Sequence, residues 1–366
     1  MKVLVINPGA TSTKIAVFDE DKRVFDAAIS HSAAELAPFE HIVDQADFRR
    51  NSITEELKKG GIRLRDMDAV CGRGGLLHHI PSGTYRVDDA VIHDILHPFY
   101  GEHAANLGPY LARELADTVG IPAFFVDPVS VDELTDVARV SGFKGMERES
   151  FFHALNQKSV ARRAAAELNR AYEDVNLIVI HMGGGVSVAA HCQGRVIDNF
   201  NVKDEGSMGM DRGGSLPVNA VVKLCYSGKT FEQVRKMLGS EAGVYSYLGT
   251  KDFREVEQRA FSGTDSEARL IFRAFAYQLA KDAGAMAAVL KFKVDAVVLT
   301  GGIACSERFC DELTQYLRGL APVIRIPGEE EMRSLAEGAL RVLHGGPCRI
   351  YEDYAGGKNA HNIAHH

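Results

Sequence analysis

The sequence lacks the features that mark secreted, membrane or nucleic-acid-binding proteins. Its six cysteines (71, 192, 225, 305, 310 and 348) form no CxxC pair and no zinc-like pairing with histidine, so we expect buried thiols in a reducing compartment. No long apolar run and no positive leader segment is present, so we expect no secretory signal, no membrane contact and a cytoplasmic location. The net charge of −7 argues against a nucleic-acid partner but leaves room for a local basic patch.

What is present is the composition of an ordinary globular protein. Charged residues make up 25% of the chain and hydrophobic residues 46%. The length of 366 residues is enough for two domains, each with its own core.

One pattern, strand–loop–strand–turn–strand, occurs twice. The first copy reads VLVI, a loop at 7–13, KIAVF, the acidic turn DEDK and VFDAA; the second reads LIVI, a glycine loop, VSVAA, HCQG and RVIDNF. Two matching copies predict a duplicated α/β domain. We place the first domain at 1–148 and the second at 149–328. We expect a final helix at about 329–345 to pack on the first domain, and a flexible tail at 356–366.

Two glycine loops follow apolar strands in the second half of the chain. Gly183, Gly184 and Gly185 come after LIVIHM, and Gly301 and Gly302 come after DAVVLT. Without Cβ atoms, such a backbone can approach an anion closely and direct several N–H groups at it. For an isolated GGG, a tight β-turn is the more common explanation, and the repeated pattern is what favours a phosphate loop.

Several charged side chains lie where strands are expected to end. Arg73 stands between two glycines after the strand DAVCG, where it is either a solvated loop residue or a fork for phosphate or carboxylate. Asp127 ends the strand PAFFV and precedes Pro128, a position where sheet proteins hold catalytic groups. His103 is either structural or catalytic. A helix is expected at 146–170, with Phe151, Phe152 and His153 in its first turns.

Nine motifs occur in the order seen in one family. They are NPGATSTK (7–14), CGRGG (71–75), VDP (126–128), FFH (151–153), HMGGGVS (181–187), GMDRGGS (209–215), KDFRE (251–255), TGGI (300–303) and IPGEEEM (326–332). The chain, from residue 1 to about 345, resembles the acetokinase family, a branch of the actin, sugar kinase and Hsp70 superfamily. The forms GRGGL, EHAAN and GGG, with Gln157 in place of the second histidine of FHGTSH, are more similar to butyrate kinases than to acetate kinases.

The resemblance implies a fold and a reaction. The fold would be two actin-like (ribonuclease H-like) ATPase domains with a cleft between them. The reaction would be direct, reversible, in-line transfer of phosphate from ATP to a short-chain fatty acid, butyrate or a branched-chain acid, giving ADP and an acyl phosphate. It further implies Mg²⁺ as a cofactor and a homo-oligomer, dimeric or higher.

The resemblance also assigns roles to residues. The catalytic residues would be Arg73, Asp127, His153 and Arg212. Magnesium would be held by Asp127 and by Glu330, or its neighbour Glu331. The nucleotide would contact two phosphate loops (Asn7, Ser12 and Lys14; His181, Gly183, Gly184 and Gly185) and an adenosine site (Asp252, Phe253, Arg254, Gly301, Gly302 and Ile303).

The chemistry suits such residues, although other functions stay open. A carboxylate is already ionised at neutral pH, so phosphoryl transfer to it needs positioning and charge neutralisation but no general base. An acetate or propionate kinase of the same family is one alternative. A sugar or polyol kinase would need a base, for which Asp127 is a candidate. A non-catalytic, actin-like nucleotide binder would keep the phosphate loops alone.

Overall fold

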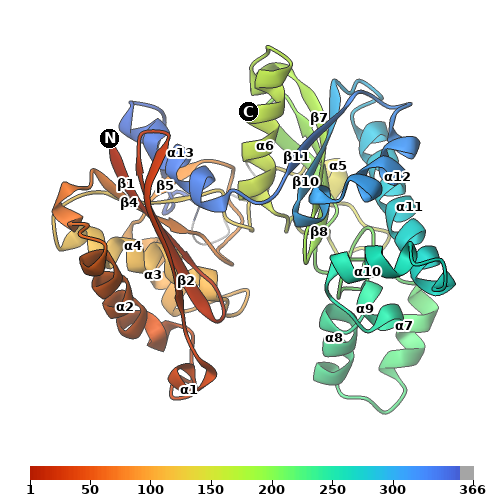
Figure 1. The fold of residues 1–366 in the computed structure, drawn as a ribbon, viewed down its shortest axis with the longest axis horizontal. Helices are drawn as coiled ribbons and strands as arrows, with labels where there is room; N and C mark the ends of the chain where they lie inside the picture. Colours follow the sequence, from red (N-terminus) through yellow and green to blue (C-terminus); the bar gives the residue numbers. More distant parts are fainter. Residues whose placement is uncertain (355–366) are drawn as a thin grey trace. The chain divides into compact units, whose positions relative to one another are not determined.

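The computed structural model describes residues 1–354 and divides them into two compact units (Figure 1). Unit 1 contains Met1–Asp132 and the segment from Glu330 onward; unit 2 contains Glu133–Glu329. The tail expected at 356–366 lies outside the described residues.

Unit 1 is built on a seven-stranded sheet with the order β12-β5-β6-β4-β1-β2-β3. β1, β2 and β3 form an antiparallel meander, and β4 and β6 continue the sheet parallel to β1. The strands are β1 (Lys2–Pro8), β2 (Ser12–Asp19), β3 (Lys22–Ser30), β4 (Ala69–Arg73), β5 (Thr84–Arg86), β6 (Ala123–Val126) and β12 (Arg349–Ile350). The helices are α1 (Ala33–Leu36), η1 (Val43–Gln45), α2 (Ala46–Lys59), η2 (Leu64–Asp66), α3 (Asp89–Leu96), η3 (Ala104–Asn106), α4 (Leu107–Asp117) and α13 (Glu331–Leu343).

Helices cover both faces of this sheet. Leu4 and Ile6 of β1 share a core with Ile53 of α2 and Leu111 of α4. α13 covers the opposite face and contacts β1, β4 and β6. Gly338 permits this packing, because a Cβ there would lie 2.5 Å from Val126 Cγ2. β1 is therefore buried on both sides, which explains its nearly continuous apolar sequence.

Unit 2 repeats the arrangement with a five-stranded sheet in the order β11-β10-β7-β8-β9. Its strands are β7 (Asn176–Met182), β8 (Val186–Cys192), β9 (Arg195–Asn199), β10 (Ala296–Gly301) and β11 (Val323–Pro327). Its helices are α5 (Asp136–Arg139), α6 (Ala154–Glu167), η4 (Tyr172–Asp174), α7 (Val218–Cys225), α8 (Phe231–Ser240), α9 (Gly243–Leu248), α10 (Phe253–Ala260), α11 (Ser266–Val289), η5 (Gly302–Cys305) and α12 (Glu307–Leu317).

β7 is again buried on both faces. Ile178 and Ile180 pack in a core with Phe272 and Phe275 of α11. Alternate residues of the strand, such as Val179, pack in a second core with α6. Each buried strand thus contributes to two cores, one on each side of its sheet.

The two units share one topology. In each, three antiparallel strands are followed across the sheet by two parallel strands: β3-β2-β1-β4-β6 in unit 1 and β9-β8-β7-β10-β11 in unit 2. Both meanders also carry a register shift between their second and third strands, at Val17/Phe18 and at Ala190/His191. The predicted duplication and the α/β fold class are confirmed.

Residues 133–148 belong to unit 2, so the division differs from the boundary expected at 148. Glu133 forms a buried ion pair with Lys158 of α6 at 2.6 Å. The Thr135 N–H donates to Ile197 O, and Arg148 pairs with Asp198 and Glu205, both at 2.9 Å. These contacts over long sequence separations bind the segment to α6 and β9, and no local change of composition marks them.

Two further expectations were wrong in part. α6 begins at Ala154, because Phe151 and Phe152 are buried in an irregular segment before it and His153 occupies the N-cap position. All six cysteines are unpaired thiols, but only Cys71 and Cys310 are buried, and three of the six are exposed.

No helix in residues 1–354 combines the length and apolar character needed to span a bilayer.

Candidate functional site

In unit 1, the ends of β1 and β4 bring two predicted residues together. Asn7 donates its Nδ2–H to Glu331 Oε2 at 2.7 Å. Arg73 Nη2 lies 2.8 Å from Glu331 Oε1, and Arg73 Nη1 donates to Glu331 Oε2 at 3.2 Å and to Asn7 Oδ1 at 3.3 Å. The Arg73 guanidinium holds a carboxylate of the protein itself with two nitrogens, and its role toward a ligand stays a prediction.

The carboxylate in this group is that of Glu331, the first residue of α13. Glu330 lies at the N-cap and forms an ion pair with Arg333 Nε at 3.1 Å. The helix register determines this difference, because neighbouring residues on a helix point about 100° apart. The structure therefore places Glu331, and not Glu330, beside Asn7 and Arg73.

Asp127 is buried directly after β6, and its carboxylate is fixed by two donors. Its Oδ1 accepts hydrogen bonds from the Ser82 hydroxyl and the Gly83 N–H, both at 2.7 Å. Its backbone has a φ of +38°, in the left-handed region that residues other than glycine rarely adopt. Such strain, in a residue with a fixed carboxylate, is typical of functional positions.

A buried arginine holds the first predicted phosphate loop. Arg49 of α2 donates from Nη1 to Gly9 O (3.0 Å) and Ser12 O (3.1 Å), and from Nη2 to Ala10 O (3.2 Å). These bonds take up carbonyl oxygens of the loop. Ser12 is half-buried, and Lys14 is exposed and lies opposite Asn7 in the β1–β2 register.

Glycines bring the end of β4 close to the start of α4. A Cβ at Gly72 would lie 2.0 Å from Gly108 O, and one at Gly75 would lie 2.0 Å from Asn106 Oδ1. The same Asn106 oxygen accepts the Leu76 N–H at 2.7 Å. Two of the butyrate kinase-like motifs, GRGGL and EHAAN, therefore contact each other directly.

His103 is the N-cap residue of η3, where its Nδ1 accepts the Ala105 N–H.

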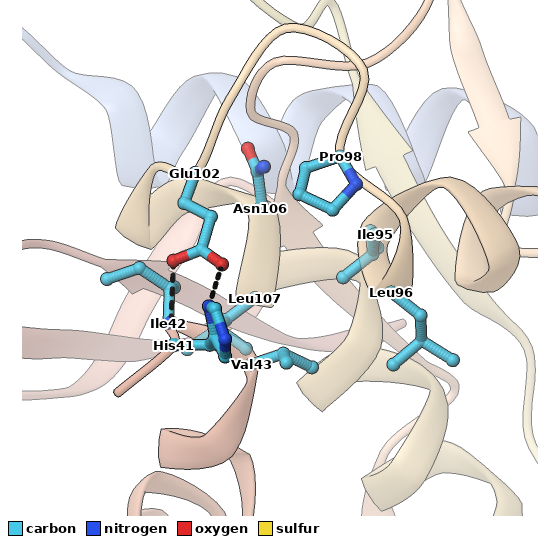
Figure 2. A pocket seen from close by; sticks show the side chains of 9 residues that line it. All are labelled: His41, Ile42, Val43, Ile95, Leu96, Pro98, Glu102, Asn106 and Leu107. Carbon is cyan, nitrogen blue, oxygen red and sulfur yellow. Dashed lines mark hydrogen bonds and ion pairs between the residues drawn. The ribbon is translucent and has the colours of Figure 1, made fainter. Parts of the chain in front are cut away.

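A mostly apolar pocket of about 320 Å³ lies in unit 1 (Figure 2). Its two ionisable side chains are paired, because Glu102 Oε1 lies 2.9 Å from His41 Nδ1 and Glu102 Oε2 accepts the Ile42 N–H at 3.0 Å. The lining residues are His41, Ile42, Val43, Ile95, Leu96, Pro98, Glu102, Asn106 and Leu107. None of the predicted site residues lines it.

In unit 2, two histidines lie against the glycine loop between β7 and β8. The rings of His153 and His181 stack with centroids 3.8 Å apart. His181 is buried; its Nδ1 lies 2.7 Å from Asn156 Oδ1, and its Nε2 lies 3.1 Å from Glu329 Oε1. A Cβ on Gly183 would lie 2.7 Å from the same Glu329 oxygen, so a side chain at this position would require the Glu329 carboxylate to move.

His153 and Arg212 meet at the last glycine of the loop. A Cβ on Gly185 would lie 3.3 Å from His153 Nε2 and 3.9 Å from Arg212 Nη1. The loop backbone, an imidazole and a guanidinium therefore converge at one point. Such a set of donors suits an anionic ligand.

Arg212 also lines an open pocket of about 690 Å³ in unit 2. Its Nη1 donates to Val202 O at 3.1 Å. Lys203 and Arg235 line the same pocket. Burial lowers the pKa of the Lys203 ammonium, and the nearby guanidinium groups of Arg212 and Arg235 lower it further. The pocket is lined by four positive side chains and by the two carboxylates of Asp204 and Glu232, and this excess of positive charge favours anions.

The predicted adenosine residues form two groups. Gly301 has a φ of +88° and lies against Met182 O, where a Cβ would be 2.3 Å away, whereas Gly302 begins η5 and is exposed. Asp252 caps α10 by accepting the Arg254 N–H at 2.9 Å and also pairs with the exposed Arg254 side chain. The Phe253 and Ile303 side chains are buried, so any ligand contact at these two residues must come mainly from the backbone.

The residues are compatible with magnesium but build no closed metal cage. Among the described residues, no group of three or more His, Cys, Asp and Glu side chains is arranged to hold an ion. Magnesium keeps several waters and usually takes only one or two protein carboxylates together with substrate phosphates. Asp127 and Glu331 are the carboxylates that fit this description.

Sequence reasoning missed two supporting residues. Arg49 lies four and eight residues before Ile53 and Leu57, on the same helical face, so an arginine at a core position of α2 was the available signal. Gln157 is fully buried and donates to Ser187 Oγ at 2.8 Å. It was noted as a departure from the family pattern, but its partners lie on other elements and could not be read from the sequence.

The loop that carries Arg212 depends on a buried carboxylate, and this leads to a pH prediction. Asp282 Oδ2 accepts the Ser207 N–H at 2.6 Å, and burial raises the pKa of the Asp282 carboxyl to about 6. Because the folded-state pKa lies above the usual value of 3.8, the folded protein binds this proton more tightly than the unfolded chain. The free energy of unfolding should therefore fall as pH rises from about 4 to about 6, by up to about 3 kcal/mol.

Asp282→Asn keeps an acceptor for Ser207 but cannot ionise. We expect it to unfold at higher urea concentration than the parent protein at pH 7.5 and at a similar concentration at pH 4.5. Urea unfolding of both proteins at the two pH values checks this. An equal difference at both values would contradict the role given to ionisation.

Comparison with known structures supports the fold. The acetate kinase of Porphyromonas gingivalis is similar with a TM-score of 0.78 and 19% identity, the propionate kinase of Francisella tularensis subsp. tularensis SCHU S4 with 0.74 and 18%, and the acetate kinase of Entamoeba histolytica with 0.75 and 16%. In each case the similarity covers 93% of this chain and 99% of the other. At these identities the likeness establishes a shared two-sheet architecture.

The sequence itself provides a family match within unit 2. The matched segment contains the glycine loop, His153, Arg212 and the first strand after α11. Residues 144–321, nearly half of the chain, match the model of the Acetokinase family.

Proposed function

We propose that this protein transfers the terminal phosphate of ATP to the carboxylate of a short-chain fatty acid, reversibly giving ADP and an acyl phosphate. One observation carries the proposal: the Gly183–Gly185 loop, His153 Nε2 and Arg212 Nη1 converge at Gly185, inside the segment that matches the Acetokinase family. Loop N–H groups, an imidazole and a guanidinium together supply donors for an anion that gains and loses phosphate.

Each group has a part in this proposal. Arg212 neutralises charge on the transferred phosphoryl group, His153 donates a hydrogen bond to it, and the glycine loop holds the nucleotide phosphates. Arg73 orients an anionic oxygen with its fork, which Glu331 preorganises from 2.8 Å. Gly302 and the surface around Asp252 and Arg254 contact the nucleoside. Because the acceptor carboxylate is already ionised, no residue has to remove a proton from it.

Magnesium fits the same scheme as a bound cofactor. It would supply positive charge to the phosphates and fix their orientation. Asp127 and Glu331 are the proposed protein ligands, with Glu331 replacing the Glu330 of our sequence-based expectation. The Ser82 and Gly83 donors that fix Asp127 Oδ1 leave Oδ2 as its oxygen for the ion or its waters.

We further propose that the preferred acid has four carbons or a branched chain, and that the reaction takes place in the cytoplasm. The support for the acid is the set of butyrate kinase-like motifs, two of which meet in unit 1. Gly72 and Gly75 replace side chains at the contact with Gly108 and Asn106. These glycines bring the end of β4 against the start of α4, so the two motifs together shape the backbone beside Arg73.

Hydroxylamine trapping tests the reaction class. The purified protein, incubated with magnesium-ATP, butyrate and hydroxylamine, should form butyryl hydroxamate, because only an acyl phosphate reacts in this way. A sugar or polyol kinase and a non-catalytic nucleotide binder would form none, so a negative result with all short-chain acids would overturn the proposal.

Arg212→Lys is the matched control for this experiment. Lysine keeps the charge but cannot reproduce the planar fork, so hydroxamate formation should fall about a hundredfold. A trace kinase in the preparation would give the same signal in both samples. Equal rates would therefore contradict the assignment of the activity to Arg212.

Selectivity among acids should be graded. Every acid presents the same carboxylate, so discrimination must come from the tail. Each buried methylene contributes about 0.8 kcal/mol, and two more carbons than acetate give about 1.6 kcal/mol, somewhat over tenfold in kcat/KM. Kinetics with acetate, propionate, butyrate and isobutyrate should place propionate between acetate and butyrate. A preference for acetate would make the protein an acetate kinase.

A substitution at Gly184 can test the role of the loop in ATP binding without changing the stability of the fold. Within the described residues nothing lies within 4 Å of a Cβ built on Gly184, and its φ is outside the left-handed region. Gly184→Ala should leave the unfolding temperature unchanged, yet weaken ATP binding at least tenfold in calorimetry, because the methyl group would enter the space of the phosphates. Undiminished ATP affinity would show that the nucleotide does not approach this loop.

A further inference from the structure

A chain of hydrogen bonds runs from the interior of unit 2 to His153. Tyr172 OH lies 2.7 Å from His191 Nδ1, and His191 Nε2 lies 2.9 Å from Gln157 Oε1. Gln157 Nε2 lies 2.8 Å from Ser187 Oγ, which in turn lies 2.9 Å from His153 Nδ1. His191, Gln157 and Ser187 are almost completely buried, so water cannot readily exchange for these partners.

The direction of every bond is determined by one backbone group. Gln157 Nε2 also lies 3.1 Å from the Ser187 carbonyl oxygen, which can only accept. This fixes the amide orientation: the NH₂ group faces Ser187 and Oε1 faces His191. Oε1 can only accept, so His191 carries a proton on Nε2. Burial lowers the pKa of His191 well below its usual value, so its ring is neutral and Nδ1 accepts the Tyr172 hydroxyl.

At the other end, the Ser187 hydroxyl has one proton to give. Its oxygen already accepts from Gln157 Nε2–H and, at 3.4 Å, from the His153 backbone N–H. Its own proton is then directed at His153 Nδ1, 2.9 Å away. A nitrogen that accepts this bond carries no proton, so a neutral His153 has its proton on Nε2.

We propose that Gln157 and Ser187 are positioning residues that hold His153 in the Nε2–H tautomer, as a fixed hydrogen-bond donor beside Gly185. The inference rests on the proposed function for its consequence: the proton on Nε2 is the one that would face the transferred phosphoryl group. The titratable and charged groups around the ring are His181, stacked on it from β7, Arg212 at the same glycine, and Glu329, 3.1 Å from His181. A fixed neutral donor adds no further positive charge to this group.

Nitrogen-15 NMR reads the tautomer directly. The protein is labelled at its 14 histidines, and the two His153 signals are assigned by their loss in His153→Gln. The unmodified protein should show a bare Nδ1 and a protonated Nε2 at His153. A protonated Nδ1 with a bare Nε2 would overturn the proposal, and this result requires no variant at Gln157 to fold.

Substitutions at Gln157 then separate polarity from packing. In Gln157→Glu the carboxylate accepts the Ser187 proton, so His153 Nδ1 should become protonated and kcat should fall about a hundredfold. Gln157→His keeps one donor for Ser187 Oγ and one acceptor for His191 Nε2–H, loses only the bond to the Ser187 carbonyl, and should keep the tautomer and most of the activity. Gln193→Glu makes the same charge change on the β8–β9 turn and should alter neither. A folded Gln157→Glu protein with unchanged tautomer and kcat would refute the role of Gln157.

The tautomer assignment and the proposed function can be wrong independently of each other. If the protein forms no hydroxamate with any acid but His153 carries its proton on Nε2, the proposed function is wrong and the positioning chain stands. If hydroxamate forms and His153 carries its proton on Nδ1, the function stands and the positioning chain is wrong.

Discussion

Each sheet depends on one central strand that is buried on both faces. β1 and β7 have the same length and the same burial pattern, and each has a polar residue at its next-to-last position, Asn7 and His181. A shift of one residue in the register would exchange the two faces of the strand and disrupt both cores. The apolar residues therefore fix the register, and the register fixes where Asn7 meets Glu331 and where His181 meets Glu329.

Close backbone contacts around these strands explain why the motifs are rich in glycine. Gly72 lies against the Gly108 carbonyl, and Gly301 lies against the Met182 carbonyl, each too close for any Cβ. These contacts bring the ends of neighbouring strands and helices together at the point where the polar side chains project. Gly184 has no such contact among the described residues. The glycines of one motif thus serve different purposes, and the sequence alone cannot separate them.

Features that depend on local pattern could be predicted from the sequence, whereas features that depend on long-range contacts could not. The two meanders, their loops and the cap at Asp252 arise from alternation, small residues and side-chain chemistry, and all are present. The two compact units divide after Asp132 and not near 148, because Glu133 and Arg148 pair with residues far along the chain. The choice between Glu330 and Glu331 needed the exact start of α13, and helix starts are the least certain part of a sequence-based assignment. The buried role of Arg49 was not predicted, because an arginine in a polar helix is usually solvated.

The orientation of the hydrogen bonds around His153 bears on the kind of acceptor that the site can serve. A hydroxyl acceptor has to lose a proton during phosphoryl transfer, so a kinase for sugars or polyols needs a base near it. With Nδ1 engaged by the Ser187 hydroxyl and the proton held on Nε2, His153 offers a donor and no vacant lone pair. Arg212 and the loop N–H groups are also donors only. The donors beside Gly185 suit a substrate that arrives already ionised, which is the property that distinguishes a carboxylate from an alcohol.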